Sequence, residues 1–331
     1  MILGQDDLEN VLNRILDKSP LLGLNALQNT TLSLWIGSGL AKIPAAYGAG
    51  LIQQYTGKSS QLISALDYCN RPFLKDSPIL ISLKGENEDA VGVAKSIANR
   101  SIKETVLITG DTEGRAALAL RSVRHSIISA SFPPRDHRCV NINSVFMLST
   151  LVYRLINQTF PKEHNNWITH DSIYTAFKKA STDSYVISDY IASIDDWSKK
   201  QLIILGQGFS SELTLTWQAI LSESGITNPI ILDIKDYTHG DHLATIKNEN
   251  VFFLIIKTPN IEKVVDVFIS RFSKKFNIVT IPLIMSGPTA FWENLFYSFN
   301  VTSLLSSLLG YGGKRPPRDP LVHSWRGWGE I

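Results

Sequence analysis

QLIILGQGFSSELTLTWQAILSESGITNPIILDIKDYTHGDH, the stretch from Gln201 to His242, decides the fold. It opens with the apolar run Gln201–Leu205, which predicts a buried strand. The turn Gly206-Gln207-Gly208 follows, where glycine lets the backbone come close to a ligand. Apolar residues at helical spacing then predict a helix from Phe209 to Ser224. A second apolar run, Pro229–Ile234, predicts a second buried strand.

Two chemically versatile side chains flank this second strand. Glu223 lies late on the predicted helix, and His239 follows sixteen residues later in a polar turn, Thr238–Asp241. A carboxylate in a cleft can act as a general base, and a histidine that titrates near neutral pH can donate or accept a proton. A lone glutamate late on a helix is more often simply solvated, and a histidine in a turn can be satisfied by backbone. His242 is a further candidate.

This constellation resembles the second half of the double sugar isomerase (SIS) domain family, which includes the isomerase half of glucosamine-6-phosphate synthase and fructosamine-type deglycases. In that family a strand leads into a Gly-x-Gly turn, the next helix ends with a catalytic glutamate, and a His-Gly comes sixteen residues later. Gly206, Gly208, Glu223, His239 and Gly240 fall on this pattern without a gap. The resemblance implies that Glu223 is the catalytic base and that His239 assists ring opening, often in the neighbouring subunit's site.

The resemblance also implies a phosphate-binding loop in the first half of the chain. The family pattern is close to Ser-x-Ser-Gly-Glu-Thr, and this chain has Ser82-Leu83-Lys84-Gly85-Glu86-Asn87. A loop that opens a helix offers free backbone N–H groups to an anion, so Ser82, Lys84 and Asn87 are candidate phosphate contacts, with Lys84 acting as a point charge. Glu86, Glu88 and Asp89 crowd the same helix start, where they could simply complement the helix dipole.

The first half repeats the strand, Gly-x-Gly and helix order of the second. The predicted strand Thr31–Ile36 leads into Gly37-Ser38-Gly39 and a helix to about Tyr55. The family often has a phosphate-contacting hydroxyl at Ser38, whereas the residues alone favour a helix N-cap there. Repetition at this scale predicts an α/β fold of two tandem SIS (flavodoxin-like) domains, each a parallel sheet flanked by helices. We expect residues 1–165 to form the first domain with an N-terminal helix, and residues 166–331 the linking helix, second domain and tail.

Further periodic segments complete the two predicted domains. The amphipathic helix Asp6–Lys18 is expected to pack on a sheet or across a dimer. The other predicted strands are Gln61–Leu66, Ile79–Ser82, Thr105–Thr109, His125–Ser129, 251–256 and 276–282. The two long helices predicted to join the halves are Val140–Phe160 and Asp171–Ile194.

The C-terminal tail bears on the reaction type. In the synthase, a lysine of the extreme C-terminus forms a Schiff base with the open-chain ketose. The matching stretch here, Pro317–Ser324, has His323 at that place. Imidazole cannot form a Schiff base but can donate or accept a hydrogen bond, so His323 is a candidate for ring opening or orientation. Amination by the synthase route is therefore disfavoured.

Composition excludes several other classes of protein. The chain has 331 residues, which is long enough for two domains of ordinary size or one large one. Of these residues 44% are hydrophobic and 19% are charged, as in a soluble globular protein. A net charge of +2 gives no argument for nucleic acid, and no apolar run reaches the ~18 residues that span a bilayer. Cys69 and Cys139 are too far apart for a metal motif, and the acidic residues of segment 1–20 exclude a signal peptide, so we expect a cytoplasmic protein.

The sequence therefore predicts an isomerase, deaminase or deglycase that acts on a sugar phosphate or amino-sugar phosphate and works as a homodimer or higher even oligomer. This chemistry needs no metal or cofactor, and both Gly-x-Gly turns lack the third glycine and the ribose-binding acid of a dinucleotide site. The alternative is a non-catalytic SIS module that binds a sugar phosphate as a sensor or assembly subunit. The altered Ser82–Asn87 loop and the missing lysine favour the module, and the Glu223/His239 pair favours the enzyme.

Overall fold

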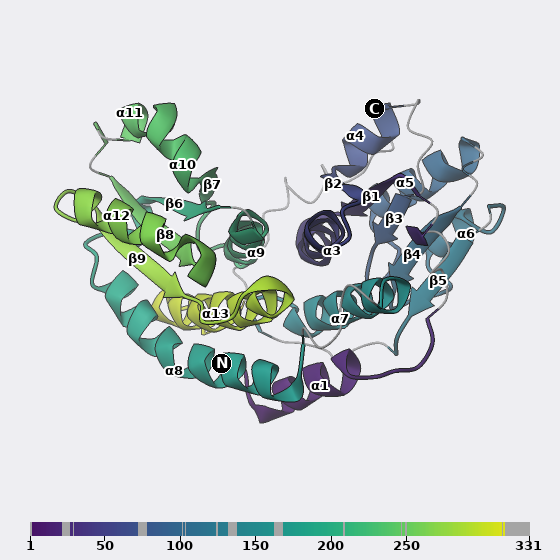
Figure 1. Cartoon of the computed structure of the whole chain (residues 1–331), viewed down its shortest axis with the longest axis horizontal. Coiled ribbons are helices and arrows are strands. Elements are labelled where there is room, and N and C mark those ends of the chain that lie inside the picture. The colour runs from purple at the N-terminus through teal and green to yellow at the C-terminus, as the bar shows by residue number, and fades with distance from the viewer. Residues whose placement is uncertain are drawn as a thin grey trace. The chain divides into compact units, whose positions relative to one another are not determined.

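The computed structural model of the chain divides into two compact units, each built on one parallel sheet (Figure 1). The N-terminal unit takes in Asn10–Asp136 and Asn141–Asn165, and the C-terminal unit takes in Met1–Glu9, His137–Val140 and Asn166–Pro316. The structure describes residues 2–21, 27–28, 30–71, 78–100, 102, 104–123, 125–131, 138–161, 168–207, 209–245, 247–248, 250–312 and 314, without the side chains of residues 55, 209–211 and 244.

Five parallel strands in the order β2-β1-β3-β4-β5 form the sheet of the N-terminal unit. Helices cover both of its faces, which explains why the central strands are continuous apolar runs. Helices α4, α5 and α6 pack against one face, and α3 and α7 against the other (Figure 1). The elements are β1 (Leu32–Gly37), η1 (Gly39–Ala41), α3 (Lys42–Tyr55), β2 (Ser59–Ile63), α4 (Ala65–Asn70), β3 (Pro78–Ile81), α5 (Glu88–Asn99), β4 (Thr105–Thr109), α6 (Arg115–Ala119), β5 (His125–Ser129) and α7 (Ile142–Thr159).

Four parallel strands in the order β7-β6-β8-β9 form the sheet of the C-terminal unit. Ile203 and Phe253 lie on one face of the sheet and pack with α10, η3 and α12. Leu202 and Phe252 lie on the opposite face and point toward α8, α9 and α13. The elements are α8 (His170–Ala192), η2 (Trp197–Lys199), β6 (Gln201–Gly206), α9 (Phe209–Glu223), β7 (Ile230–Asp233), α10 (Ile234–Asp236), η3 (Tyr237–Asp241), α11 (His242–Thr245), β8 (Val251–Lys257), η4 (Pro259–Ile261), α12 (Glu262–Phe272), β9 (Asn277–Pro282) and α13 (Gly287–Leu308).

Both sheets contain a topological switch point, where successive connections leave in opposite directions. It lies between β1 and β3 in the N-terminal sheet and between β6 and β8 in the C-terminal sheet. In open α/β sheets, ligands bind beyond the carboxyl ends of the strands at such a point. The predicted fold class, two tandem parallel-sheet domains flanked by helices, is confirmed.

The predicted strand Gln61–Leu66 is wrong at its C-terminal end. Strand β2 ends at Ile63, and the next residues form α4. Ser64 explains the change, because its Oγ accepts the backbone N–H of Asp67 at 3.0 Å and so caps a helix start. Leu66 is then a helical residue with 52% exposure, not a core strand residue.

The first residues of the chain are held in the C-terminal unit. The backbone N–H of Leu3 donates to Asn300 Oδ1 at 2.8 Å. The guanidinium of Arg138 donates two hydrogen bonds to the Asp7 carboxylate, at 2.9 and 3.0 Å, and lies over the Phe299 ring. The apolar residues of α1 (Gln5–Ile15) are buried within the single chain: Leu8, Val11, Leu12 and Ile15.

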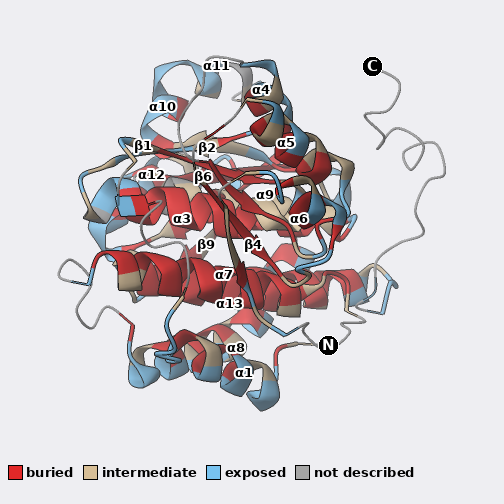
Figure 2. Ribbon diagram, turned by 90° about the vertical axis from the view of Figure 1, so that its right-hand side faces the viewer, coloured by how far each residue is buried: buried red, intermediate tan, exposed pale blue. Residues whose placement is uncertain are grey.

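Helix α13 is buried along most of its length (Figure 2), and its buried residues include polar ones. The Glu293 side chain is fully buried, and its carboxylate accepts the backbone N–H groups of Ile284, at 3.0 and 3.1 Å, and of Met285, at 2.9 Å. Burial raises the pKa of Glu293. Asn294 accepts a hydrogen bond from the buried Trp217 indole at 2.8 Å. Helix α13 therefore fixes the segment that leaves β9 by polar contacts.

No helix in the described part of the chain combines the length and apolar character needed to cross a membrane.

Candidate active site

The carboxyl ends of β1 and β3 bring Ser38 and Ser82 to the switch point of the N-terminal sheet. Gly37 and Ile81, the last residues of these strands, are paired, and the two serines follow directly. A Cβ at Gly37 would lie 2.3 Å from the carbonyl oxygen of Ala41, so this turn requires glycine. Ser38 occupies the N-cap position of η1 but makes no capping hydrogen bond with its side chain. The two predicted phosphate-contacting serines therefore face the same end of the sheet.

The loop from Ser82 to Asn87 is folded around its own hydrogen bonds. Ser82 Oγ accepts the backbone N–H of Gly85 at 3.2 Å, and Gly85 has a φ of +66° that favours glycine. The Asn87 side chain accepts the N–H of Asp89 at 3.1 Å and caps α5. Lys84 is exposed. Ser82 and Asn87 thus have structural roles in the loop, and Lys84 is its exposed cation.

The start of α6 closes this loop with contacts that the sequence did not indicate. The backbone N–H of Arg115 donates to Glu86 Oε1 at 3.0 Å, and its guanidinium contacts Glu88 Oε1 at 2.6 Å. The hydrogen bond from Arg115 lowers the pKa of Glu88. A Cβ at Gly114 would lie 2.1 Å from the carbonyl oxygen of Lys84, so glycine lets the two loops touch. The loop presents carboxylates and the exposed cation of Lys84 at the start of α5.

Glu223 and His239 lie at opposite ends of β7. Helix α9 runs back from the carboxyl end of β6, so its last residue, Glu223, lies near the amino end of the sheet. His239 follows the carboxyl end of β7, which is four residues long. A strand advances about 3.3 Å per residue, so the two side chains are separated by more than ~10 Å. Glu223 is half-buried and His239 is exposed, and one chain does not bring them together.

The predicted polar turn Thr238–Asp241 is wrong, because these residues lie in the helical segment η3. The Asp233 carboxylate accepts the N–H of Lys235 at 2.7 Å and starts the preceding helix α10. Tyr237 is fully buried and packs edge-on against Phe253, which anchors the helical segment to the sheet. The further candidate His242 also contacts Tyr237, through its ring and through a hydrogen bond to the Tyr237 carbonyl at 3.3 Å.

Glu212 is a candidate that sequence reasoning missed. It lies in the first turn of α9, just beyond the carboxyl end of β6 and thus at the switch point of the C-terminal sheet. Burial raises the pKa of Glu212 to about 7, the range suited to a general acid or base. An acidic residue at a helix start ordinarily complements the helix dipole, so the sequence carried no sign of this burial.

Glu212→Gln is expected to alter how stability depends on pH. Because the pKa of Glu212 lies above its ordinary 4.5 in the folded state, the folded protein holds more protons between pH 4.5 and 7. The wild-type free energy of unfolding therefore falls as pH rises through this window, and the glutamine variant lacks that fall. We expect the variant to gain on the order of 1–2 kcal/mol relative to wild type between pH 4 and 8, measured by urea unfolding. Parallel pH profiles would contradict this.

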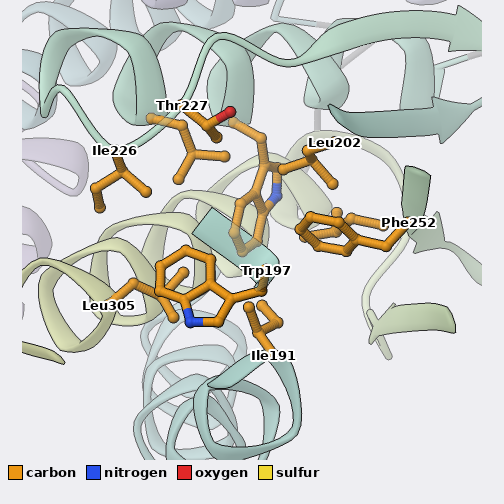
Figure 3. A pocket seen from close by; sticks show the side chains of 10 residues that line it. Ile191, Trp197, Leu202, Ile226, Thr227, Phe252 and Leu305 are labelled. Carbon is orange, nitrogen blue, oxygen red and sulfur yellow. The ribbon is translucent and has the colours of Figure 1, made fainter. Parts of the chain in front are cut away.

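An apolar pocket lies beside the end of α9 (Figure 3). Ile226 and Thr227 line it on one side, and Trp197 and Leu305 approach from the opposite side. Leu221, near the end of α9, also lines it. Its cavity volume is about 10 Å³, enough for about one water molecule. A sugar needs more room and polar partners, so this pocket is a packing gap and not a substrate site.

Some predicted site residues lie outside the described residues. These are His323, in the tail, and Gly208, the second glycine of the turn after β6. Among the residues that the structure does describe, no three His, Cys, Asp or Glu side chains are grouped so that they could hold a metal ion.

Comparisons with solved structures show which proteins share this fold. Glucosamine-6-phosphate deaminase from Thermotoga maritima aligns over 96% of this chain and 98% of its own, with a TM-score of 0.68 and 16% identity. The C-terminal domain of glucosamine-fructose-6-phosphate aminotransferase from Francisella tularensis aligns over 91% and 94%, with a TM-score of 0.67 and 13% identity. Tagatose-6-phosphate ketose/aldose isomerase from Escherichia coli aligns over 95% and 90%, with a TM-score of 0.66 and 15% identity.

No protein-family profile matches the sequence, and no curated protein matches it. The likeness is therefore one of fold, and it extends over nearly the whole chain. The predicted resemblance to double SIS-domain proteins is confirmed at this level.

Proposed function

We propose that this chain is an enzyme that isomerises, deaminates or deglycates a sugar phosphate or amino-sugar phosphate. Glu223 is the base that moves a proton between adjacent sugar carbons, and His239 assists ring opening. Ser38 and the loop from Ser82 to Asn87 receive the phosphate, and His323 orients the open-chain sugar. The observation that carries the proposal is the sixteen-residue Glu223–His239 spacing on a fold shared, over at least 90% of this chain, with a deaminase and an isomerase of sugar phosphates.

A thermal-shift screen over phosphorylated and unphosphorylated sugars tests the proposal first. A ligand at 100 times its dissociation constant stabilises the folded state by about 2.7 kcal/mol, which is readily measured. Sugars that bind are then incubated in D₂O, where an isomerase must exchange the proton next to the carbonyl. Binding of sugar phosphates without exchange or amine release would instead support the second candidate function.

That second candidate is a non-catalytic module that binds a sugar phosphate as a sensor or assembly subunit. Two observations favour it. The loop at the N-terminal switch point directs its own carboxylates, Glu86 and Glu88, toward Arg115, and Glu223 and His239 do not meet within one chain. The retained spacing of this pair favours the enzyme.

Lys84→Ala decides whether the ligand is phosphorylated. Lys84 is the exposed cation of a loop that otherwise presents Glu86 and Glu88. If it holds a phosphate, the substitution should weaken binding by about 1.5–3 kcal/mol, the range for hydrogen bonds to charged groups, and leave an unphosphorylated analogue unaffected. Calorimetric titration measures both. A silent substitution, together with no competition from millimolar inorganic phosphate, would exclude this loop as the phosphate site.

A homodimer with shared sites would unite Glu223 of one copy with His239 of the other. Mixing Glu223→Gln with His239→Asn, each inactive alone, should then restore about a quarter of wild-type activity. Half of the randomly formed dimers are mixed, and each has one intact site of two. The variants are unfolded and refolded together before assay, and self-mixed samples serve as controls. Light scattering that shows a monomer with activity intact would rule out this arrangement.

A further inference from the structure

A polar cavity of about 450 Å³ lies within the N-terminal unit, away from the switch point. It is walled by α1, by the residues just after β5 and by α7, through side chains that include Asn13, Arg14, Ser129, Thr150 and Arg154. Strand β5 is the edge of the sheet, two strands from β3, which at about 4.8 Å per strand places the cavity ~10 Å from the Ser82 strand. Its volume falls within the range of small-molecule sites, about 300–1,000 Å³.

One wall of the cavity is a fixed ion pair. Arg154 is buried, with Nη1 2.8 Å from Asp17 Oδ2, while its Nη2 donates to the Ser19 carbonyl at 2.8 Å and to Ser19 Oγ at 2.9 Å. Hydrogen bonds from Ser19 lower the pKa of Asp17, so this carboxylate stays ionised. Asp17 and Arg154 therefore neutralise each other, and Arg154 Nε is left buried with no hydrogen-bond partner among the described residues.

Arg14 gives the cavity wall a net positive charge, because Asp17 and Arg154 neutralise each other. It is half-buried, burial lowers its pKa, and among the described residues it makes no hydrogen bond or ion pair. Asp17 is the one carboxylate among the described residues of the cavity wall, and it is already paired with Arg154. A partly desolvated cation without an anion is costly, and an anionic ligand in the cavity would remove that cost.

The remaining polar side chains suit hydroxyl groups. Thr150 Oγ1 donates to the Met147 carbonyl at 2.8 Å, which leaves its lone pairs to accept from a ligand. Ser129, Ser131 and Asn13 add two hydroxyls and an amide that are exposed at the rim. Hydroxyls and amides can donate to and accept from a polyol at once, whereas an apolar ligand would leave them unsatisfied.

We propose that this cavity is a second ligand site, which binds a small phosphorylated polyol with Arg14 on the phosphate and the serine, threonine and asparagine side chains on the hydroxyls. The site is separate from Glu223 and its role does not depend on the proposed reaction. It would let a sugar phosphate act on this unit without binding at Glu223.

Methyl NMR tests the proposal, because Leu21, Ala130, Thr150 and Leu151 line the cavity and carry methyl groups. Inorganic phosphate, glucose 6-phosphate and glucose are titrated separately into the full-length protein. We expect these methyl resonances to shift with phosphate, to shift at lower concentration with glucose 6-phosphate, and to respond least to glucose. Absence of any shift up to about 20 mM phosphate, the concentration that matches a binding free energy of about −2.3 kcal/mol, or equal affinity for glucose, would overturn the proposal.

Arg14→Gln should weaken glucose 6-phosphate binding at these methyl groups by about 10- to 100-fold. Lys18→Gln is the matched control, since it removes the same charge from an exposed residue nearby that is not on the cavity wall, and should change affinity less than about 2-fold. Asn13→Trp, at an exposed helical position, should block the cavity without removing charge. Glu223→Gln should leave the titration unchanged. Unaltered binding in Arg14→Gln and Asn13→Trp would refute the site.

Discussion

Replacing Glu223 with glutamine should abolish turnover while ligand affinity stays within a few-fold. The change keeps the shape of the side chain and removes the base, so the loss should fall on the chemical step. General acid–base catalysis contributes about 10²- to 10⁴-fold, and kcat should fall by that factor. Deuterium incorporation from solvent at the carbon next to the carbonyl should disappear in parallel, as measured by NMR of the product.

Glu212→Gln is the matched control for this experiment. The two carboxylates lie at opposite ends of α9, Glu212 at the switch-point end and Glu223 at the other. Glu212, with a pKa raised by burial to about 7, is the chain's other candidate base on this helix. If Glu223→Gln still exchanges the proton at the wild-type rate and Glu212→Gln does not, the catalytic assignment moves to Glu212.

Glu293→Leu should cost about 3–5 kcal/mol of unfolding free energy. The Glu293 carboxylate is fully buried and accepts the backbone N–H groups of Ile284 and Met285. A leucine leaves both of these partly buried donors without an acceptor, and each such donor costs about 1–3 kcal/mol. The segment between β9 and α13 would lose its anchor to the helix. Urea denaturation followed by circular dichroism measures the change.

Glu293→Gln separates the hydrogen bonds from the charge. Glutamine retains one oxygen that can accept from Ile284 or Met285, so its cost should stay near 1–2 kcal/mol. Burial raises the pKa of Glu293, which makes loss of the charge less costly than loss of the acceptor. If leucine costs no more than glutamine, these backbone hydrogen bonds do not anchor the segment.

The strands could be predicted because apolar runs report burial directly. Gln201–Leu205 and Thr105–Thr109 are continuous apolar or β-branched runs, and the structure contains β6 and β4 at those positions. The meeting of Ser38 and Ser82 follows from strand order, which the repeated strand–turn–helix pattern only implied. The fold class could therefore be predicted from the periodicity of apolar residues and the repeated strand–turn–helix order.

The remainder depends on contacts that periodicity does not encode. Ser64 ends strand β2 because its Oγ accepts the backbone N–H of Asp67 and caps helix α4. Tyr237 anchors the polar segment η3 to the sheet because its buried ring packs against Phe253. The burial of Glu212 depends on what surrounds the first turn of α9, not on the residue itself. Likewise, the sequence predicted a strand between Glu223 and His239, but their sixteen-residue spacing did not show that the two side chains lie at opposite ends of that strand.

The anchoring of the first residues has a consequence for synthesis on the ribosome. Leu3 and Asp7 emerge long before their partners, because Arg138 follows Asp7 by 131 residues and Asn300 follows Leu3 by 297 residues. The N-terminal sheet can complete while the C-terminal sheet is still being translated, since domains generally fold as units. The contact between Leu3 and Asn300 must therefore wait for helix α13 to leave the exit tunnel. An extension fused ahead of Leu3 would thus slow the docking of this segment onto α13, which is a late step of folding, and not the formation of the N-terminal sheet.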